Sequence, residues 1–195
     1  KTDFFNNLQK SIIEIIDSTN LFQPVEENEL GFLNLVFNHN VLIKNLTNKK
    51  SDFLKAFNLN LVSAAEVIKT FGDDLKQNKG SIVLFSTVAV KQGFPNHVIV
   101  SSAKGAIEGL TIALAAEFAP NIRVNCIAPS LTNSKMSGNL LKNEKIAEGI
   151  AKMHPLKRLG EGADSSSLAR FLLSNESSWI TGQVFGVDGG RSSVA

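Results

Sequence analysis

SIVLFS, at residues 81–86, is a short run of apolar and β-branched residues that follows a polar turn at residues 78–80. A run of this length, bounded by a turn, is typical of a strand buried inside a sheet. Residues 101–118 come next, are rich in alanine and glycine, and have the length and composition of a helix. IRVNCI, at residues 122–127, then repeats the strand pattern. The order strand, helix, strand predicts two parallel strands joined by a right-handed crossover.

The alternation continues on both sides of this unit. Two more helices and two more strands are predicted, with the helices at residues 4–16 and 51–71 and the strands at residues 33–37 and 182–187. In the longer helix Ser51 is the expected N-cap and Gly72 the expected stop. Strands alternating with long helices predict an α/β fold, an open parallel sheet with helices on both faces. No linker or repeat divides the chain, so we expect one domain over residues 1–195.

Composition excludes several classes of protein. The 195 residues are 43% hydrophobic and carry a net charge of +2 that is spread along the chain, which indicates a globular protein without an electrostatic footprint for nucleic acid or an anionic membrane. No apolar run is expected to reach the roughly 20 residues of a membrane span. The single cysteine, Cys126, and three scattered histidines predict neither a disulfide nor a metal site. We therefore expect a cytoplasmic protein that binds no nucleic acid, membrane or metal.

Ligands of open parallel sheets bind beyond the carboxyl ends of the strands. The segments that follow the four predicted strands are therefore the candidate binding positions. They are residues 38–40, 86–88, 129–131 and 188–190.

Several of these segments resemble motifs of the short-chain dehydrogenase/reductase family, in order and in spacing. The matching stretches are LVFNHN at 35–40, LNL at 59–61, GSIVLFST at 80–87, IRVNCIAP at 122–129, and ITGQV with VDGG at 180–184 and 187–190. The last pair is the most specific. The resemblance covers nearly the whole chain and implies a Rossmann-like, doubly wound parallel sheet, with NAD or NADP as cofactor and a small carbonyl or alcohol as substrate. It also implies a homo-oligomer formed through the helices at 51–71 and 101–118.

The resemblance assigns roles to individual residues. The catalytic positions are Asn60, Thr87 and Lys104, and Val100 stands at the position of the family's tyrosine. The cofactor-binding positions are Asp3, Asn38, Lys104, Pro129 and Ser134. Each assignment has a structural alternative: Lys104 anchors a ribose or is simply solvated, Asn60 orients a water or bonds the backbone, and Ser86 and Thr87 cap the strand end. The three histidines, His39, His97 and His154, are expected in loops.

Two departures from the family bear on activity. The chain has 13 phenylalanines and no tyrosine, so the family's proton donor has no replacement of its kind. A phenol titrates near pH 10 and an aliphatic hydroxyl several units higher, and loss of a general acid costs about 10²–10⁴-fold in rate. In addition, nothing before the first helix resembles the glycine-rich loop that holds the cofactor pyrophosphate. We therefore expect that the first strands are missing and that cofactor binding is weak.

Two functions follow as hypotheses. The first is an NAD(P)-dependent oxidoreductase of the short-chain type with weak or absent turnover. The alternative is a non-catalytic relative that serves as a subunit or interaction scaffold. The choice between NAD and NADP and the identity of the substrate stay open, because the segment from Thr132 to Pro155, expected as a loop around the substrate pocket, carries no diagnostic chemistry.

Overall fold

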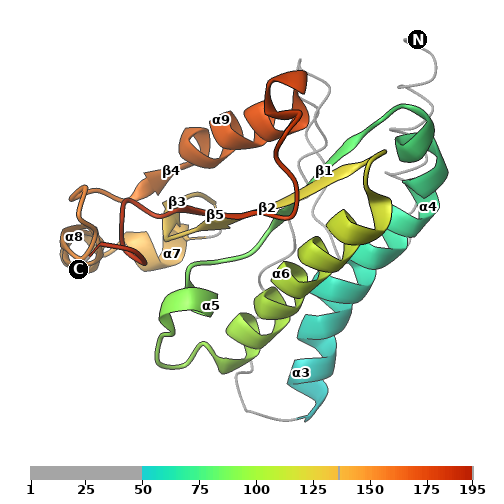
Figure 1. Cartoon of the computed structure of the whole chain (residues 1–195). Helices are drawn as coiled ribbons and strands as arrows, with labels where there is room; N and C mark the ends of the chain where they lie inside the picture. Colours follow the sequence, from blue (N-terminus) through green and yellow to red (C-terminus); the bar gives the residue numbers. More distant parts are fainter. Residues whose placement is uncertain (1–49, 136, 195) are drawn as a thin grey trace. The chain divides into compact units, whose positions relative to one another are not determined.

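Among the described residues, three parallel strands form the main sheet (Figure 1). The computed structural model describes residues 50–135 and 137–194. Within them β1 (Ser81–Phe85) and β5 (Val184–Val187) flank β2 (Arg123–Pro129), and both pair with it in parallel. The parallel pairing expected from the strand and helix order is therefore confirmed, and the fold is α/β.

The register of the three strands brings their carboxyl ends to one edge of the sheet. Phe85 at the end of β1 lies opposite Ile127, and Pro129 at the end of β2 lies opposite Val187 of β5. The segments that follow the strands therefore meet at this edge, where an open parallel sheet binds its ligands.

One face of the sheet is covered by two long helical segments that run side by side (Figure 1). The first consists of α3 (Lys50–Phe57), the π-helical turn η1 (Asn58–Val62) and α4 (Ser63–Gln77). The second is α6 (Val98–Phe118), which packs on β1 and β2. A core of buried side chains joins them to the strands and consists of Ile68, Ile82, Ala115, Ile122 and Val124.

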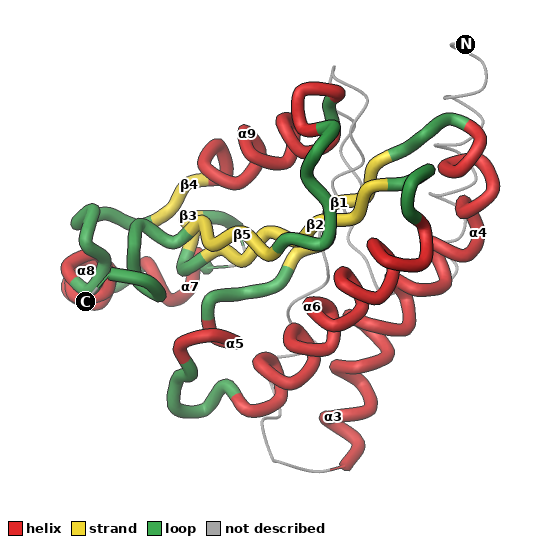
Figure 2. Tube along the Cα trace, viewed as in Figure 1, coloured by secondary structure: helices red, strands yellow, loops and turns green. Residues whose placement is uncertain are grey.

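The opposite face carries α9 (Gly162–Leu173). Successive residues of a strand point to opposite faces, and Ile82 belongs to the core beneath α6 while the Ser81 hydroxyl donates to the Leu172 carbonyl of α9 at 2.9 Å. The sheet therefore has helices on both faces, as expected for a doubly wound fold. Figure 2 shows the strands between the two helical layers.

The first long helical segment differs from its prediction at both ends. Ser51 is the second residue of α3 and not the residue before it, and the helical segment continues through Gly72 to Gln77. A Cβ at Gly72 would meet nothing within 4 Å, so the glycine is an interior helical residue that costs about 1 kcal/mol relative to alanine. The helix ends where Lys79 adopts a left-handed φ of 50° and the Gly80 N–H donates to the Leu75 carbonyl at 2.7 Å.

Two other boundaries are corrected. The second long helix begins at Val98, three residues earlier than expected. The last strand begins at Val184, because Gly182 has a φ of +70°, which is outside the strand region.

The segment between β2 and α9 is structured, although Thr132 to Pro155 was expected as a loop. Short elements occupy this segment and the other connections; they are α5 (Ala89–Gln92), β3 (Thr132–Asn133), α7 (Gly138–Leu141), α8 (Glu144–Lys152), β4 (Gly160–Glu161) and η2 (Asn175–Ser177). β3 and β4 pair in parallel, and Asn143 caps α8 by accepting from the N–H groups of Lys145 and Ile146. These elements are too short for apolar periodicity to reveal them.

The apolar length of α6 was underestimated from the sequence. This helix has 21 residues and a window with a mean hydropathy of 1.5, so its length and composition alone would allow it to cross a membrane. The core helix of a soluble protein passes the same test, and α6 packs along β2.

Some predictions lie outside the described residues. They are the helix at 4–16, the strand at 33–37, and the cofactor positions Asp3 and Asn38.

Candidate functional site

Backbone hydrogen bonds hold the strand ends together at the carboxyl edge of the sheet. The Ser86 N–H donates to the Ile127 carbonyl at 2.8 Å, and the Val88 N–H donates to the Pro129 carbonyl at 3.1 Å. The segment after β1, which contains Thr87, is therefore fixed beside Pro129 at the end of β2. The structure brings these two predicted positions together.

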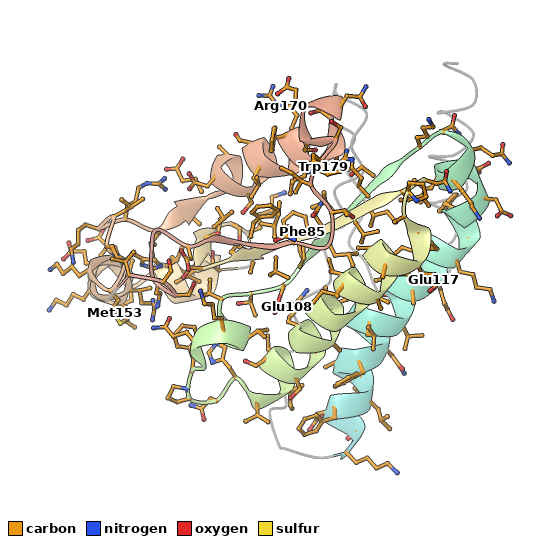
Figure 3. The ribbon with its side chains drawn as sticks, viewed as in Figure 1. Phe85, Glu108, Glu117, Met153, Arg170 and Trp179 are labelled. Atoms are coloured by element: carbon orange, nitrogen blue, oxygen red, sulfur yellow. The ribbon has the colours of Figure 1, made fainter. Side chains whose placement is uncertain are left out.

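Lys104 reaches this edge from α6. Its Nζ donates to the carbonyl oxygen of Phe85 at 2.9 Å (Figure 3 labels Phe85 at the end of β1). Burial lowers the pKa of Lys104, and the Cys126 thiol acts in the opposite direction. The Lys104 side chain is therefore half-buried and bonded to the strand end, and it is not a fully solvated lysine.

Val100 precedes Lys104 by one helical turn, so both side chains lie on the same side of α6. Its side chain is 36% exposed. Thr87 lies after β1, and its Oγ1 accepts a hydrogen bond from the Ala89 N–H at 3.3 Å. The Thr87 hydroxyl thus makes a local bond at the start of α5, whereas its structural alternative was a cap of the strand end. No hydrogen bond joins it to Lys104 in the described part of the chain.

Asn60 lies in the π-helical turn η1, which packs against α6. Its Nδ2 donates to the Ala56 carbonyl at 2.9 Å, one turn earlier in the same helix. This is the backbone hydrogen bond that was considered for Asn60. Its position beside α6 still places it near the helix that carries Lys104.

A partly buried pair beneath the strand end was not anticipated as a site. The Ser86 hydroxyl, 5% exposed, donates to Glu108 Oε1 at 2.5 Å (Figure 3 labels Glu108 on α6). Glu108 comes one turn after Lys104, and the same hydroxyl lies 3.4 Å from the Lys104 carbonyl oxygen. Glu108 therefore already accepts a hydrogen bond from the Ser86 hydroxyl. No sequence pattern reports a contact between residues 22 positions apart in the chain.

A second polar pair stabilises the turn after β2. The Ser130 Oγ lies 2.8 Å from His154 Nε2, and His154 Nδ1 lies 2.9 Å from the Ile150 carbonyl oxygen. A carbonyl only accepts, so Nδ1 carries a proton, and in the neutral imidazole Nε2 accepts from the serine hydroxyl. His154 lies in a turn, as expected, but is 1% exposed and has both nitrogens bonded. It is a structural residue that locks the turn holding Ser130.

Ser134 lies apart from this cluster. Its side chain is exposed, and its hydroxyl lies 3.3 Å from the Ser137 hydroxyl. No contact of Ser134 with Lys104 or Thr87 is found among the described residues.

Asp188 follows β5 directly and lies at the carboxyl edge of the sheet. Burial raises the pKa of this carboxyl, but hydrogen bonds from Ser192 and Gly190 outweigh it, so the pKa lies below its usual value. Oδ1 accepts from the Gly190 N–H and Oδ2 from the Ser192 N–H, both at 2.9 Å. These bonds explain the aspartate as the organiser of a tight turn. Among residues 50–135 and 137–194 no group of three potential ligands could hold a metal ion.

In the described part of the chain, a three-stranded parallel sheet with helices on both faces defines an α/β, Rossmann-like class of protein. A family model described as Enoyl-(Acyl carrier protein) reductase matches residues 19–192. The chain therefore belongs to the short-chain dehydrogenase/reductase family, whose motifs the sequence resembled.

Individual relatives agree with this assignment. The chain is 36% identical over 175 residues to a tropinone reductase homolog of Arabidopsis thaliana, covering 87% of this chain and 66% of the relative. It is 35% identical to human dehydrogenase/reductase SDR family member 4, covering 71% of this chain and 51% of the relative. The chain thus spans two thirds or less of the length of these relatives.

Solved structures show the same fold. ElxO with NADP bound superposes with a TM-score of 0.69 at 30% identity, covering 74% of this chain and 59% of that chain. A short-chain type dehydrogenase/reductase from Mycobacterium ulcerans gives a TM-score of 0.70 at 28% identity, covering 75% and 55%.

Proposed function

We propose that the chain keeps the nicotinamide end of a short-chain dehydrogenase cofactor site and turns over carbonyl or alcohol substrates weakly or not at all. The observation that carries the proposal is the pair of Val100 and Lys104 on one side of α6. The lysine reaches the strand ends, while an apolar side chain stands where the family's proton donor would be.

The residues at this edge fit the ribose end of NAD or NADP. The Lys104 ammonium has three donors, and the hydrogen bond to Phe85 uses one of them, so two are left for ribose hydroxyls. The cofactor would supply hydride transfer when bound. ElxO has been solved with NADP bound, which supports a nicotinamide cofactor for this chain by likeness alone.

The missing step is proton transfer. Reduction of a carbonyl needs a proton on the oxygen, and the hydroxyls nearby are aliphatic and therefore weak acids. Ser86 already donates its proton to Glu108, whereas Thr87 only accepts, from the Ala89 N–H. Without a phenol we expect a rate lower by about 10²–10⁴-fold than in a relative with an intact site.

Thermal unfolding with each nicotinamide nucleotide tests the cofactor site. NADPH or NADH at about 100 times its Kd stabilises a folded protein by about 2.7 kcal/mol. We expect a rise in Tm with at least one of them, reduced in Lys104→Met and kept in Lys157→Met, in which an exposed lysine is lost. No shift with either nucleotide at millimolar concentration would contradict the proposed site.

Restoring the phenol tests the proton donor. Val100→Tyr is expected to raise NADPH-dependent reduction of a broad panel of small ketones and aldehydes by about 10²–10⁴-fold. The matched control is Val98→Tyr, two residues earlier on α6 and so on a different side of the helix, where the native side chain is 57% exposed. Equal rates in both variants would contradict the assigned role of position 100.

The second candidate, a non-catalytic subunit, is favoured by the outer face of the two long helices. Here α4 and α6 form a groove of about 360 Å³ whose lining includes Ile68 and Leu114. Its charged lining consists of Lys69, Asp73 and Lys76 on α4 and Glu117 on α6 (Figure 3 labels Glu117). An apolar groove bordered by charges of both signs suits a second copy of the same chain related by a two-fold axis.

Oligomeric state in solution tests this candidate. Leu110 lines this groove on α6 and is half-buried, and Leu110→Glu is expected to convert a dimer to a monomer in light scattering. The control is Leu156→Glu, which changes a residue that is 66% exposed in a turn outside these helices. A monomeric wild-type chain would contradict the subunit hypothesis.

A further inference from the structure

Lys104 and Glu108 lie one helical turn apart on α6. Residues four positions apart are neighbours on the surface of a helix, and a lysine and a glutamate at this spacing attract each other. Both side chains are half-buried and described, yet no ion pair joins the two. Each of them bonds the end of β1 instead.

The two bonds go to successive residues of the strand end. Lys104 Nζ donates to the Phe85 carbonyl at 2.9 Å, and the Ser86 hydroxyl donates to Glu108 Oε1 at 2.5 Å (Figure 3 labels Phe85 and Glu108). The Ser86 N–H also donates to the Ile127 carbonyl of β2 at 2.8 Å, so the backbone that carries this hydroxyl is itself fixed to the sheet. The strand end is thus fastened to α6 at two points and to β2 at a third.

The alternation of side chains along β1 explains why Ser86 meets Glu108. Successive side chains of a strand point to opposite faces, and Ile82 and Leu84 pack in the core beneath α6. Ser86 continues this series toward α6 and is 5% exposed. A buried hydroxyl needs a hydrogen-bond partner, and the carboxylate provides one at the short distance of a charge-assisted bond.

The hydrogen bond from Ser86 keeps the carboxylate apart from the ammonium. Burial lowers the pKa of Lys104, and a carboxylate in contact with the ammonium would oppose that shift. Another titratable side chain near Lys104 is the Cys126 thiol of β2; burial, and after it the charge of Glu108, raise its pKa to about 11. These directions agree with a carboxylate that faces Ser86 and β2 and not Lys104.

We propose that Ser86 and Glu108 are positioning residues for the Lys104 ammonium. Ser86 holds the Glu108 carboxylate at the strand end, so the ammonium has no competing partner on its own helix and bonds the Phe85 carbonyl. Loss of the Ser86 hydroxyl releases the carboxylate, which then pairs with Lys104 and draws the ammonium along α6, away from β1. The inference rests on the proposed function only for the ligand that this ammonium serves, the ribose of a nicotinamide nucleotide.

Three variants of the full chain separate this role from a merely structural one. Ser86→Ala removes the donor and leaves the charge, so Glu108 should pair with Lys104. Glu108→Gln keeps an acceptor for Ser86 without the charge and should leave Lys104 in place. The double variant, Ser86→Ala with Glu108→Gln, has no charge that attracts Lys104, so the ammonium should return to Phe85. A loss of packing alone predicts no such recovery.

The pH dependence of Lys104 acetylation measures the placement without any nucleotide. Acetic anhydride reacts with the neutral amine, and peptide mass spectrometry gives the midpoint for Lys104, with the exposed Lys157 as internal reference. An ion pair with a carboxylate raises the pKa of a lysine. The Lys104 midpoint should therefore move to higher pH in Ser86→Ala and return to the wild-type value in the double variant. The control Glu117→Gln, which changes an exposed glutamate of the same helix, should leave the midpoint unchanged.

Two results of this titration would overturn the proposal. One is an unchanged midpoint in Ser86→Ala, and the other is the same raised midpoint in the single and the double variant. If Ser86→Ala fails to fold, Ser86→Cys replaces it, because a thiol is similar in shape and a weaker donor. The midpoint should then rise in Ser86→Cys, and an unchanged value there would overturn the proposal equally.

Calorimetric titration with NADPH separates this proposal from the proposed function. Ser86→Ala should weaken NADPH binding about tenfold, because the ammonium leaves the ribose end of the site, and the double variant should recover most of the affinity. The expected midpoints without NADPH binding by the wild type support the positioning pair and reject the cofactor site. NADPH binding together with an unchanged midpoint in Ser86→Ala rejects the positioning pair and leaves the cofactor site standing.

Discussion

Val100 and Lys104 show how the side chain at one position of α6 limits the chemistry available at the strand ends. The backbone places both side chains on the same side of α6, and the lysine still reaches the end of β1. Valine carries no titratable hydroxyl, whereas the lysine keeps its amine, whose pKa is lowered by burial. In the proposed function, position 100 alone accounts for the missing proton donor.

Cys126 allows a prediction at the residue scale. The thiol is fully buried in β2, and burial raises its pKa to about 11. At pH 8 only about one thousandth of the Cys126 side chains is then thiolate, and a thiol reagent in solvent does not reach the buried sulfur. We expect no reaction of the folded chain with dithionitrobenzoate over an hour, and one thiol per chain in urea. Rapid labelling without urea would show that β2 is open at this position.

α9 shows how an element is fastened to the sheet. Arg123, the first residue of β2, donates from Nη1 to the Leu172 carbonyl and the Ser177 hydroxyl, both at 2.9 Å. Its Nη2 donates to the Ser174 carbonyl, also at 2.9 Å. One guanidinium thus satisfies the end of α9 and the start of η2, which a single ammonium has no geometry to do.

Arg123→Lys is therefore expected to destabilise the fold. The substitution keeps the charge but leaves at least one of these partly buried acceptors without a donor, at a cost of about 1–3 kcal/mol. Urea unfolding followed by circular dichroism measures this loss. The control Arg170→Lys changes an exposed arginine of α9 and should alter the unfolding free energy by less than about 0.5 kcal/mol. Equal stabilities of the two variants would show that the hydrogen bonds of the Arg123 guanidinium are dispensable.

The start of α9 gives a prediction about pH. Hydrogen bonds from Arg158 and from the Glu161 N–H lower the pKa of Asp164 from 3.8 to about 2. A carboxyl with a lowered folded-state pKa stabilises the fold above its unfolded value and loses that contribution as the pH falls. Asp164→Asn should therefore lower the Tm at pH 7, and its difference from the wild type should shrink between pH 4 and pH 2.

The matched control for that titration is Asp73→Asn, which changes an exposed carboxylate of α4. It should leave the Tm almost unchanged at both pH values. A constant difference between Asp164→Asn and the wild type across the acid range would mean that the charge of Asp164 contributes nothing at the helix start.

At the scale of the whole described unit, the two faces of the sheet differ in how they present apolar surface. The α4 and α6 side forms the groove proposed for a second copy, whereas the α9 side presents Trp179, which is 98% exposed (Figure 3). The chain has a single tryptophan, so its fluorescence reports on this side alone.

Acrylamide quenching of Trp179 therefore distinguishes the two sides. If a dimer forms through the long helices, the tryptophan stays in solvent, and we expect nearly the same quenching constant in the native state and in urea. The emission maximum should also move little on unfolding, although circular dichroism reports the loss of helix. Strong protection of Trp179 in the native state would place a contact on the α9 side instead.

Much of the architecture was predictable because it depends on local patterns. The short apolar runs at β1 and β2 and the long helices between and before them follow from periodicity and turn residues. The short elements α5, α7 and α8 were not predictable, since four to nine residues hold too few turns for a periodic signal. The helix end at Gly72 was misplaced because a glycine stops a helix only where the backbone turns left-handed, and that turn falls at Lys79.

The sequence alone established the absence of a phenol, the position of Val100 one turn before Lys104, and the parallel order of the strands, because each depends on composition or spacing along the chain. Only the tertiary structure revealed that Lys104 bonds the Phe85 carbonyl, that Ser86 engages Glu108, and that His154 holds Ser130. These contacts join residues 19 to 24 positions apart. Their partners are chosen by how helices pack on a sheet, and that packing is a property of the folded chain with no counterpart in a local pattern.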